Sequence, residues 1–344
     1  MKGMKPLLFT AGCTALLCLA ACDTGKDTPD TPQGNIPVGF SGDLPATRVL
    51  QEYASASDLS SIGVFAYFTH GSFNSGSATP NFMYNQKVER QSSPNNWTYS
   101  PEKYWPNNES DKLSFFAYAP YVDETAAGAP LTFKDKTTAG YPVLTYTVPT
   151  TEAAQIDLLA AVPLIDQTYS GTSGNVKFQL NHALTKVTVK IKNDESHTVK
   201  AVTSLTLSAP AGGQLTYRVP TSTGATPCVW STLSANTGFT ATLSSTPIPV
   251  EDTEKLLATF YQIPVGNPSS VSLTLTYTVT RKNSTGNTDN VTVTKENISL
   301  PATPEWNPGA SVGYVLNVSG DRLTIDSAQE ISWAEGDKTE GELN

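Results

Sequence analysis

Apolar and polar positions alternate with a period of two along most of the chain from Ile36 onward. In residues 185–191, Val and Ile alternate with Lys and Thr, and in residues 271–279 apolar residues alternate with Ser and Thr. Residues 312–318 repeat this pattern near the C-terminus. The period predicts antiparallel strands that pack one face against a core and leave the other face in water.

Two segments are apolar on both faces, which is typical of central strands that are covered on both sides. They are residues 61–68 and residues 113–119. Breakers rich in Gly, Pro, Ser and Asn separate the apolar runs, as at residues 93–96 and 283–287. A helical pattern is confined to residues 152–161, where we expect a short helix. Many short strands punctuated in this way indicate β-sandwiches.

The expected fold class is therefore all-β, with two β-sandwich domains in series. Turn residues at 171–174 separate two apolar blocks, and we place the domain boundary there. The N-terminal sandwich would then comprise residues 36–174 and the C-terminal sandwich residues 175–344. The chain from residue 22 onward is long enough for two domains of ordinary size.

The first residues have the pattern of an export signal. Two lysines precede an uncharged, mostly apolar run at residues 6–21, which is too short to cross a bilayer comfortably as a helix. We predict that residues 1–21 are a signal peptide. The run ends in Leu-Ala-Ala followed by Cys22, which resembles the bacterial lipobox, whose Cys is diacylated. The alternative is a plain secretory signal in which Cys22 is incidental.

Lipid on Cys22, for example palmitate, would anchor the mature protein to a membrane that it does not span. Residues 22–35 are rich in Thr, Pro, Gly and Asp, and we expect them to form a solvated tether. Cys228 would then be the one thiol left in the mature chain, so no internal disulfide is possible. Stability has to come from a buried core.

The chain is acidic, with 31 acidic residues against 22 basic ones and a net charge of −9. This balance lacks the basic footprint of a nucleic-acid-binding protein. We read the charge as an aid to solubility at a cell surface.

The sequence offers little that would carry catalysis. His70, His182 and His197 form no short-spaced metal pair, and we expect His182 to be a structural imidazole. The chain has no Gly-x-Ser-x-Gly elbow, Walker loop or His-Glu-x-x-His motif. Acidic pairs occur at residues 194–195 and 251–252, beside turn-forming or polar residues. We expect them to lie in charged loops and not to act as a general acid and base. We predict a protein that is not an enzyme, with no catalytic residues, no cofactor and no metal site.

Several aromatic and apolar motifs follow one another in a fixed order over most of the mature chain. Burial alone would explain each of these aromatic side chains. The ordered set nevertheless resembles the fimbrillin family of Bacteroidetes, in particular the fimbrillin-like proteins related to the minor fimbria. The motifs are Trp97 to Tyr99, Lys103 to Pro106, Leu113 to Pro120, Asp157 to Ala161, Val176 to Val187, Trp306 to Gly309 and Ile331 to Trp333.

The resemblance implies two transthyretin-like β-sandwich domains, made as a lipoprotein precursor. In that family a protease cuts after an arginine near the start of the fold and removes the first strand, and the groove then accepts a strand from the next subunit. Matching parts here are an alternating strand at residues 36–40 and a cut between Arg48 and Val49, which would remove residues 36–48. Against this, Pro37 cannot donate a ladder hydrogen bond and suits only an edge strand. The alternative for Arg48 is a solvated loop residue in an uncut arm.

The resemblance therefore implies a structural or adhesive subunit of a surface fimbria, or pilus, at the cell outer membrane. Its partners would be other subunits arranged head to tail, the outer membrane through the lipid, and ligands on host or bacterial surfaces. The rival function is a surface lipoprotein that binds glycans for nutrient uptake. A glycan binder would need exposed aromatic platforms, so the burial of Trp97, Trp105 and Trp230 discriminates between the two. The position of the subunit in the fimbria, as stalk, anchor or tip, stays open.

Overall fold

The computed structural model describes most of the chain from residue 36 onward. The expected signal peptide and tether lie outside the described residues, as do Cys22, Arg48 and Val49. Across the described ranges, no helix is long and apolar enough to cross a membrane. The described residues are 36–43, 59–91, 97–193, 199–221, 226–243, 248–282, 284–319 and 322–333.

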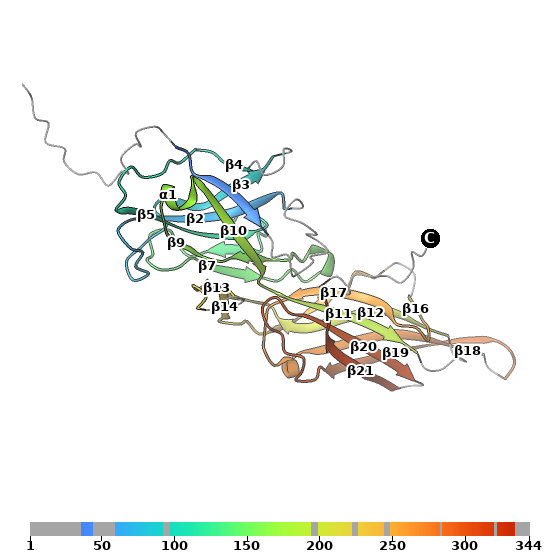
Figure 1. Cartoon of the computed structure of the whole chain (residues 1–344). Coiled ribbons are helices and arrows are strands. Elements are labelled where there is room, and N and C mark those ends of the chain that lie inside the picture. The colour runs from blue at the N-terminus through green and yellow to red at the C-terminus, as the bar shows by residue number, and fades with distance from the viewer. Residues whose placement is uncertain are drawn as a thin grey trace, which may run out of the picture.

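The described part of the fold is all-β, as the alternation predicts, and its strands form four sheets that gather in two groups along the molecule (Figure 1). Within the same residues, three short helical turns interrupt the strands. They are η1 (Glu152–Ala154), α1 (Tyr169–Thr172) and η2 (Pro268–Ser270).

Sheet A is the largest sheet, with strand order β1-β10-β8-β5-β2-β3-β4 and with β9 paired to β5. Nearly all residues of its central strands β2 and β5 are buried, so the two segments with apolar residues on both faces are central strands, as predicted. The strands are β1 (Gly39–Asp43), β2 (Ser61–His70), β3 (Met83–Arg90), β4 (Trp97–Thr98), β5 (Asp111–Ala119), β8 (Leu159–Ala161), β9 (Leu164–Gln167) and β10 (Asn175–His182).

Sheet B has the order β14-β13-β7-β6 and shares a hydrophobic core with one face of sheet A. Phe65 and Tyr118 of sheet A belong to the same buried cluster as Tyr146 and Tyr217 of sheet B. The opposite face of sheet A carries a second cluster, which includes Trp105. The strands of sheet B are β6 (Leu131–Phe133), β7 (Val143–Thr147), β13 (Gly212–Tyr217) and β14 (Cys228–Ser231).

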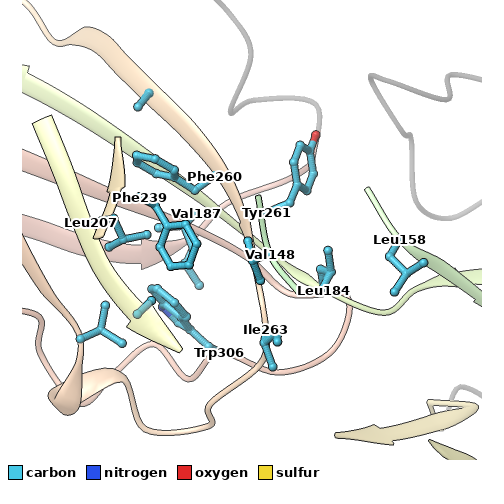
Figure 2. Packing of buried hydrophobic residues seen from close by; sticks show 14 of the residues in the cluster. Val148, Leu158, Leu184, Val187, Leu207, Phe239, Phe260, Tyr261, Ile263 and Trp306 are labelled. Atoms are coloured by element: carbon cyan, nitrogen blue, oxygen red, sulfur yellow. The ribbon is translucent and has the colours of Figure 1, made fainter. Parts of the chain in front are cut away.

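Sheets C and D enclose the core of the second group of strands. Phe239, Phe260 and Trp306 point toward one another between these strands, with Val187 and Leu207 beside them (Figure 2). Sheet C has the order β17-β11-β20-β21, and sheet D has the order β15-β12-β18-β19 with β16 paired to β12. The strands are β11 (Thr185–Lys192), β12 (Val199–Pro210), β15 (Asn236–Thr240), β16 (Ile248–Val250), β17 (Lys255–Gln262), β18 (Ser272–Lys282), β19 (Thr288–Ser299), β20 (Ser311–Ser319) and β21 (Arg322–Glu330).

Strand pairing crosses the boundary that we expected at Gly174. The turn is present, since α1 ends there and Gly174 has a positive φ of 82°. However, β10 follows this turn and pairs with β1 and β8 inside sheet A. Val176 and Phe178 of β10 belong to the buried cluster of sheet A, and burying these side chains keeps β10 in that sheet. The turn therefore joins elements within one half, and the chain enters sheet C only at Thr185.

The helix expected at residues 152–161 is wrong beyond its first turn. Only η1 forms, and Leu159–Ala161 is the strand β8, which lies between β10 and β5. The side chains of η1 and its flank instead cover the edge of sheet C. Glu152 accepts hydrogen bonds from the amides of Thr242 and Thr259, at 2.7 and 2.6 Å, and Gln155 accepts one from the amide of Tyr261 at 2.8 Å. This segment therefore ties the two groups of strands together.

Candidate functional site

The N-terminal strand lies between two walls of the first group of strands. On one side, β1 runs parallel to β10, with Gly39 opposite Asn175 and Asp43 opposite Gln179. On the other side, the residues just before β1 pair with the segment 103–105. We call the space that residues 36–43 occupy the β1 slot.

Backbone hydrogen bonds hold the start of this segment against the 103–105 wall. The amide of Val38 donates to the carbonyl of Lys103 at 2.9 Å, and the amide of Trp105 donates to the carbonyl of Ile36 at 3.1 Å. Neither bond uses the nitrogen of Pro37. The residue is exposed and forms an antiparallel bridge with Tyr104. Pro37 therefore fits this position without loss of either bond.

Side chains of the same segment pack on the rings of Tyr99, Phe115 and Phe178, which we call the aromatic floor of the slot. Phe40 is 3% exposed, and its ring lies 5.3 Å from that of Tyr99, 5.9 Å from that of Phe115 and 5.9 Å from that of Phe178, centroid to centroid. Val38 is fully buried in the same cluster. Burying two such side chains stabilises the strand by about 1.5–3 kcal/mol each.

Polar groups of the floor fix the position of the strand. The hydroxyl of Tyr99 donates to the carbonyl of Val38 at 2.9 Å, and burial raises the pKa of Tyr99 to about 12. The indole N–H of Trp105 donates to the carbonyl of Gly174 at 3.2 Å, and that carbonyl also accepts the amide of Gly39 at 2.9 Å. A Cβ on Gly39 would lie 3.3 Å from this oxygen, so the strand passes close to the turn before β10.

The predicted maturation site follows β1 in sequence and lies outside the described residues. The described chain ends at Asp43 after β1 and resumes at Leu59, so Arg48 and Val49 lie between, outside the described residues. The sequence pattern predicts a strand at residues 36–40, whereas β1 runs from Gly39 to Asp43, and it misses the 103–105 wall. The available signal is the cluster of aromatic residues at 97–105, which the sequence alone presents as core and as part of the family motifs.

The tryptophans do not form an exposed platform. Trp97 and Trp105 are 8% and 1% exposed. Trp230 is half-buried, and its indole N–H donates to the carbonyl of Ala183 at 2.7 Å. The feature that would favour a glycan binder is therefore lacking at these three residues.

The other polar candidates also have structural surroundings. His182 lies buried with Nδ1 2.9 Å from Oδ1 of Asp157, and His70 makes a similar contact with Asp111 at the surface. Burial raises the pKa of the Cys228 thiol to about 12, which makes it a poor nucleophile. In the described part of the chain, no group of three or more His, Cys, Asp or Glu residues is placed to hold a metal ion.

A family model described as fimbrillin-like matches residues 47–339. The chain belongs to this family. The resemblance drawn from the aromatic motifs is thereby confirmed. Among curated proteins, the fimbrium subunit Fim1C of Phocaeicola vulgatus is 26% identical over 385 aligned positions, which cover 96% of this chain and 97% of that protein.

Two solved structures share the fold over most of this chain. A fimbrial protein from Bacteroides vulgatus superposes with a TM-score of 0.62 at 23% identity and covers 86% of this chain and 99% of that one. A candidate cell adhesion protein from Bacteroides uniformis gives a TM-score of 0.50 at 17% identity, with the same coverage of 86% and 99%. In this chain, β1 precedes the residues that match the family model, which begin at Thr47.

Proposed function

We propose that this fimbrillin-like chain is a structural or adhesive subunit of a surface fimbria, exported as a lipoprotein precursor and assembled by strand exchange. The name of the relative Fim1C, a fimbrium subunit, supports the fimbrial role. The observation that carries the assembly mechanism is the seat of the N-terminal segment: β1 pairs with β10, the residues just before it pair with the 103–105 wall, and Val38 and Phe40 are buried in the cluster of sheet A. We assign the chain no catalytic role.

The proposal includes two transthyretin-like β-sandwich domains. Sheets A and B would form the first domain and sheets C and D the second. In this division β10, β13 and β14 belong to the first domain, because they pair with its strands although they follow Gly174 in sequence. The first domain then contains the complete β1 slot.

Loss of β1 would leave two kinds of group without partners. The outer edge of β10 and the 103–105 wall would lose their backbone hydrogen bonds, and the rings of Tyr99, Phe115 and Phe178 would lose their cover. An extended strand from another subunit satisfies both needs at once. Repetition of such a head-to-tail contact gives a filament when it does not close on itself.

An arginine-specific protease tests this mechanism on the purified precursor that lacks its signal. We expect a new N-terminus at Val49 and, for a stalk subunit, a ladder of oligomers that survive mild detergent. Arg48→Ala should block both results. Arg90→Ala is the matched control and should change neither, because Arg90 is the last residue of β3 and pairs with Trp97 of β4.

Two outcomes would narrow or overturn the proposal. A cleaved product that stays monomeric removes the stalk role and leaves a tip or anchor role. If Arg48 stays uncut in cells that display the protein, maturation by this cleavage is wrong.

The lipid anchor is tested separately, because export does not depend on strand exchange. The position of Cys22 directly after the apolar run motivates this part of the proposal. Cys22→Ser should move the protein from the membrane fraction to the soluble fraction, whereas Cys13→Ser should not. Unchanged partitioning of the Cys22 variant into detergent would contradict a lipid anchor and the outer-membrane location that follows from it.

A further inference from the structure

The chain directly after β21 carries a buried tryptophan that contacts the first group of strands. Trp333 is 7% exposed, and its indole lies flat on the ring of His182, with centroids 3.6 Å apart and planes 9° apart. His182 is the last residue of β10, and its Nδ1 is 2.9 Å from Oδ1 of Asp157. The side chains of His182 and Asp157 are each 2% exposed, so their contact holds the imidazole in place beneath the indole.

Contacts with three further residues fix Trp333 where the chain passes from sheet A to sheet C. Its indole N–H donates to the carbonyl of Gly309 at 3.0 Å. Its own carbonyl accepts a hydrogen bond from the Lys186 ammonium at 2.8 Å, and the same ammonium lies 5.6 Å from the centre of its ring. The ring of Tyr261 packs nearby, with centroids 6.0 Å apart. One side chain is thus bound to β10, β11, β17 and the segment before β20.

The strand that precedes Trp333 is far less buried than Trp333 itself. Among the described strands β21 pairs with β20 alone, at the edge of sheet C. None of its nine residues is buried, and its apolar residues Leu323 and Ile325 are only partly covered. Edge strands of this kind are ready to pair with another chain. β21 itself is held by its ladder with β20 and by the partly exposed ion pair between Lys192 and Asp326, whereas the buried side chain that follows it, Trp333, lies beyond its end.

We propose that Trp333 is a lock for β21. While the indole lies on His182, β21 stays on its own subunit, and withdrawal of the indole frees the strand for pairing with a second copy of this chain. The role of the freed strand rests on the strand exchange proposed above, but the lock is a property of the single uncut chain. His182 and the residues that pair with β1 belong to the same strand, β10, so the lock and the β1 slot are neighbours in sheet A.

Hydrogen exchange of the uncut, monomeric precursor tests the lock. Truncation of a buried tryptophan lowers stability. If that loss falls on β21, the equilibrium constant for local opening of this strand should rise roughly 100-fold. In Trp333→Ala we therefore expect the amides of β21 to exchange about 100-fold faster, while the amides of β11 keep their protection. Trp333→Phe keeps an aromatic ring over His182 and loses the indole N–H bond, so its increase should be about tenfold.

Trp230→Ala is the matched control. Trp230 is also a partly buried tryptophan, its N–H donates to the carbonyl of Ala183 beside the same junction, and it belongs to β14. This variant should leave the exchange of β21 unchanged.

The lock is contradicted if the amides of β21 and β11 exchange faster by the same factor in the Trp333 variants, because the indole then adds only to global stability. It is also contradicted if β21 is unchanged. If Trp333→Ala does not fold, Trp333→Phe decides by the same criterion. None of these measurements needs cleavage at Arg48 or assembly, so failure of the lock and failure of strand exchange give different results.

Discussion

β1 and β21 are both edge strands, and the structure holds them in opposite ways. β1 has five residues, and the segment that contains it buries Val38 and Phe40 in the slot between β10 and residues 103–105. β21 has nine residues and a longer ladder, but it pairs with β20 alone and buries none of its own residues. A ladder hydrogen bond has a modest net value, because water replaces it in the unfolded chain. Burial of side chains, and not ladder length, therefore decides which strand is held more firmly.

This difference suits the two roles proposed for the strands. A strand segment that is held by two buried side chains leaves its slot at a large cost, so its replacement calls for a cut in the chain and a matching strand. The cut changes an intramolecular contact into one between separate molecules, and a tethered donor can then compete for the slot. A strand whose buried anchor lies beyond its end can separate more readily once that anchor is released.

The largest expected effect is at the aromatic floor of the β1 slot. Phe40→Ala should lower the free energy of unfolding of the uncut precursor by about 3–5 kcal/mol, because it empties a site enclosed by three rings. Urea denaturation measures the change. Ser41→Ala, on the same strand, loses one hydrogen bond with Asn175 and should cost no more than about 1 kcal/mol. Equal costs for the two variants would mean that burial does not hold β1.

A smaller effect is expected in the middle of β21. Ile325→Ala removes a partly covered side chain, and we expect a loss of about 1–2 kcal/mol in the free energy of unfolding, below the range for buried Ile. The same urea titration measures it. A loss as large as that of Phe40→Ala would remove the contrast between the two strands.

The third expected effect comes from the hydroxyl that fixes the backbone of the β1 segment. Tyr99→Phe removes the donor to the carbonyl of Val38 and should cost about 1 kcal/mol at neutral pH. The ring remains, so the packing against Phe40 should be unchanged. If the variant is as stable as the wild type, side-chain burial alone positions the strand.

The smallest effect concerns the same phenol at alkaline pH. Burial raises the pKa of Tyr99 from 10.0 to about 12, so its neutral form is favoured in the folded state. A group whose pKa is raised on folding contributes stability that is complete below its unfolded pKa and is lost as pH rises through its folded pKa. The stability difference between wild type and Tyr99→Phe should therefore shrink between pH 10 and about 12. A difference that stays constant over this range would contradict the assignment.

Much of the fold could be predicted because periodicity reports which face of a strand is covered. The alternating run at 185–191 lies in β11, and the runs at 271–279 and 312–318 lie almost wholly in β18 and β20. The errors occurred where local signals were real but did not determine pairing. The turn at Gly174 joins elements within sheet A, and the apolar residues after η1 pair with distant strands instead of continuing a helix.

The amino-acid sequence alone was enough to predict the all-β class, the family, the central positions of β2 and β5 and the presence of an N-terminal strand. Each of these follows from the order of residue types along a short stretch or from an ordered set of motifs. Two features are visible only in the folded chain: residues 103–105 form the second wall of the β1 slot, and Trp333 lies on His182. They could not be predicted because these contacts join residues far apart in the chain. Such partners are selected by the burial that the whole fold achieves, and local periodicity carries no record of that choice.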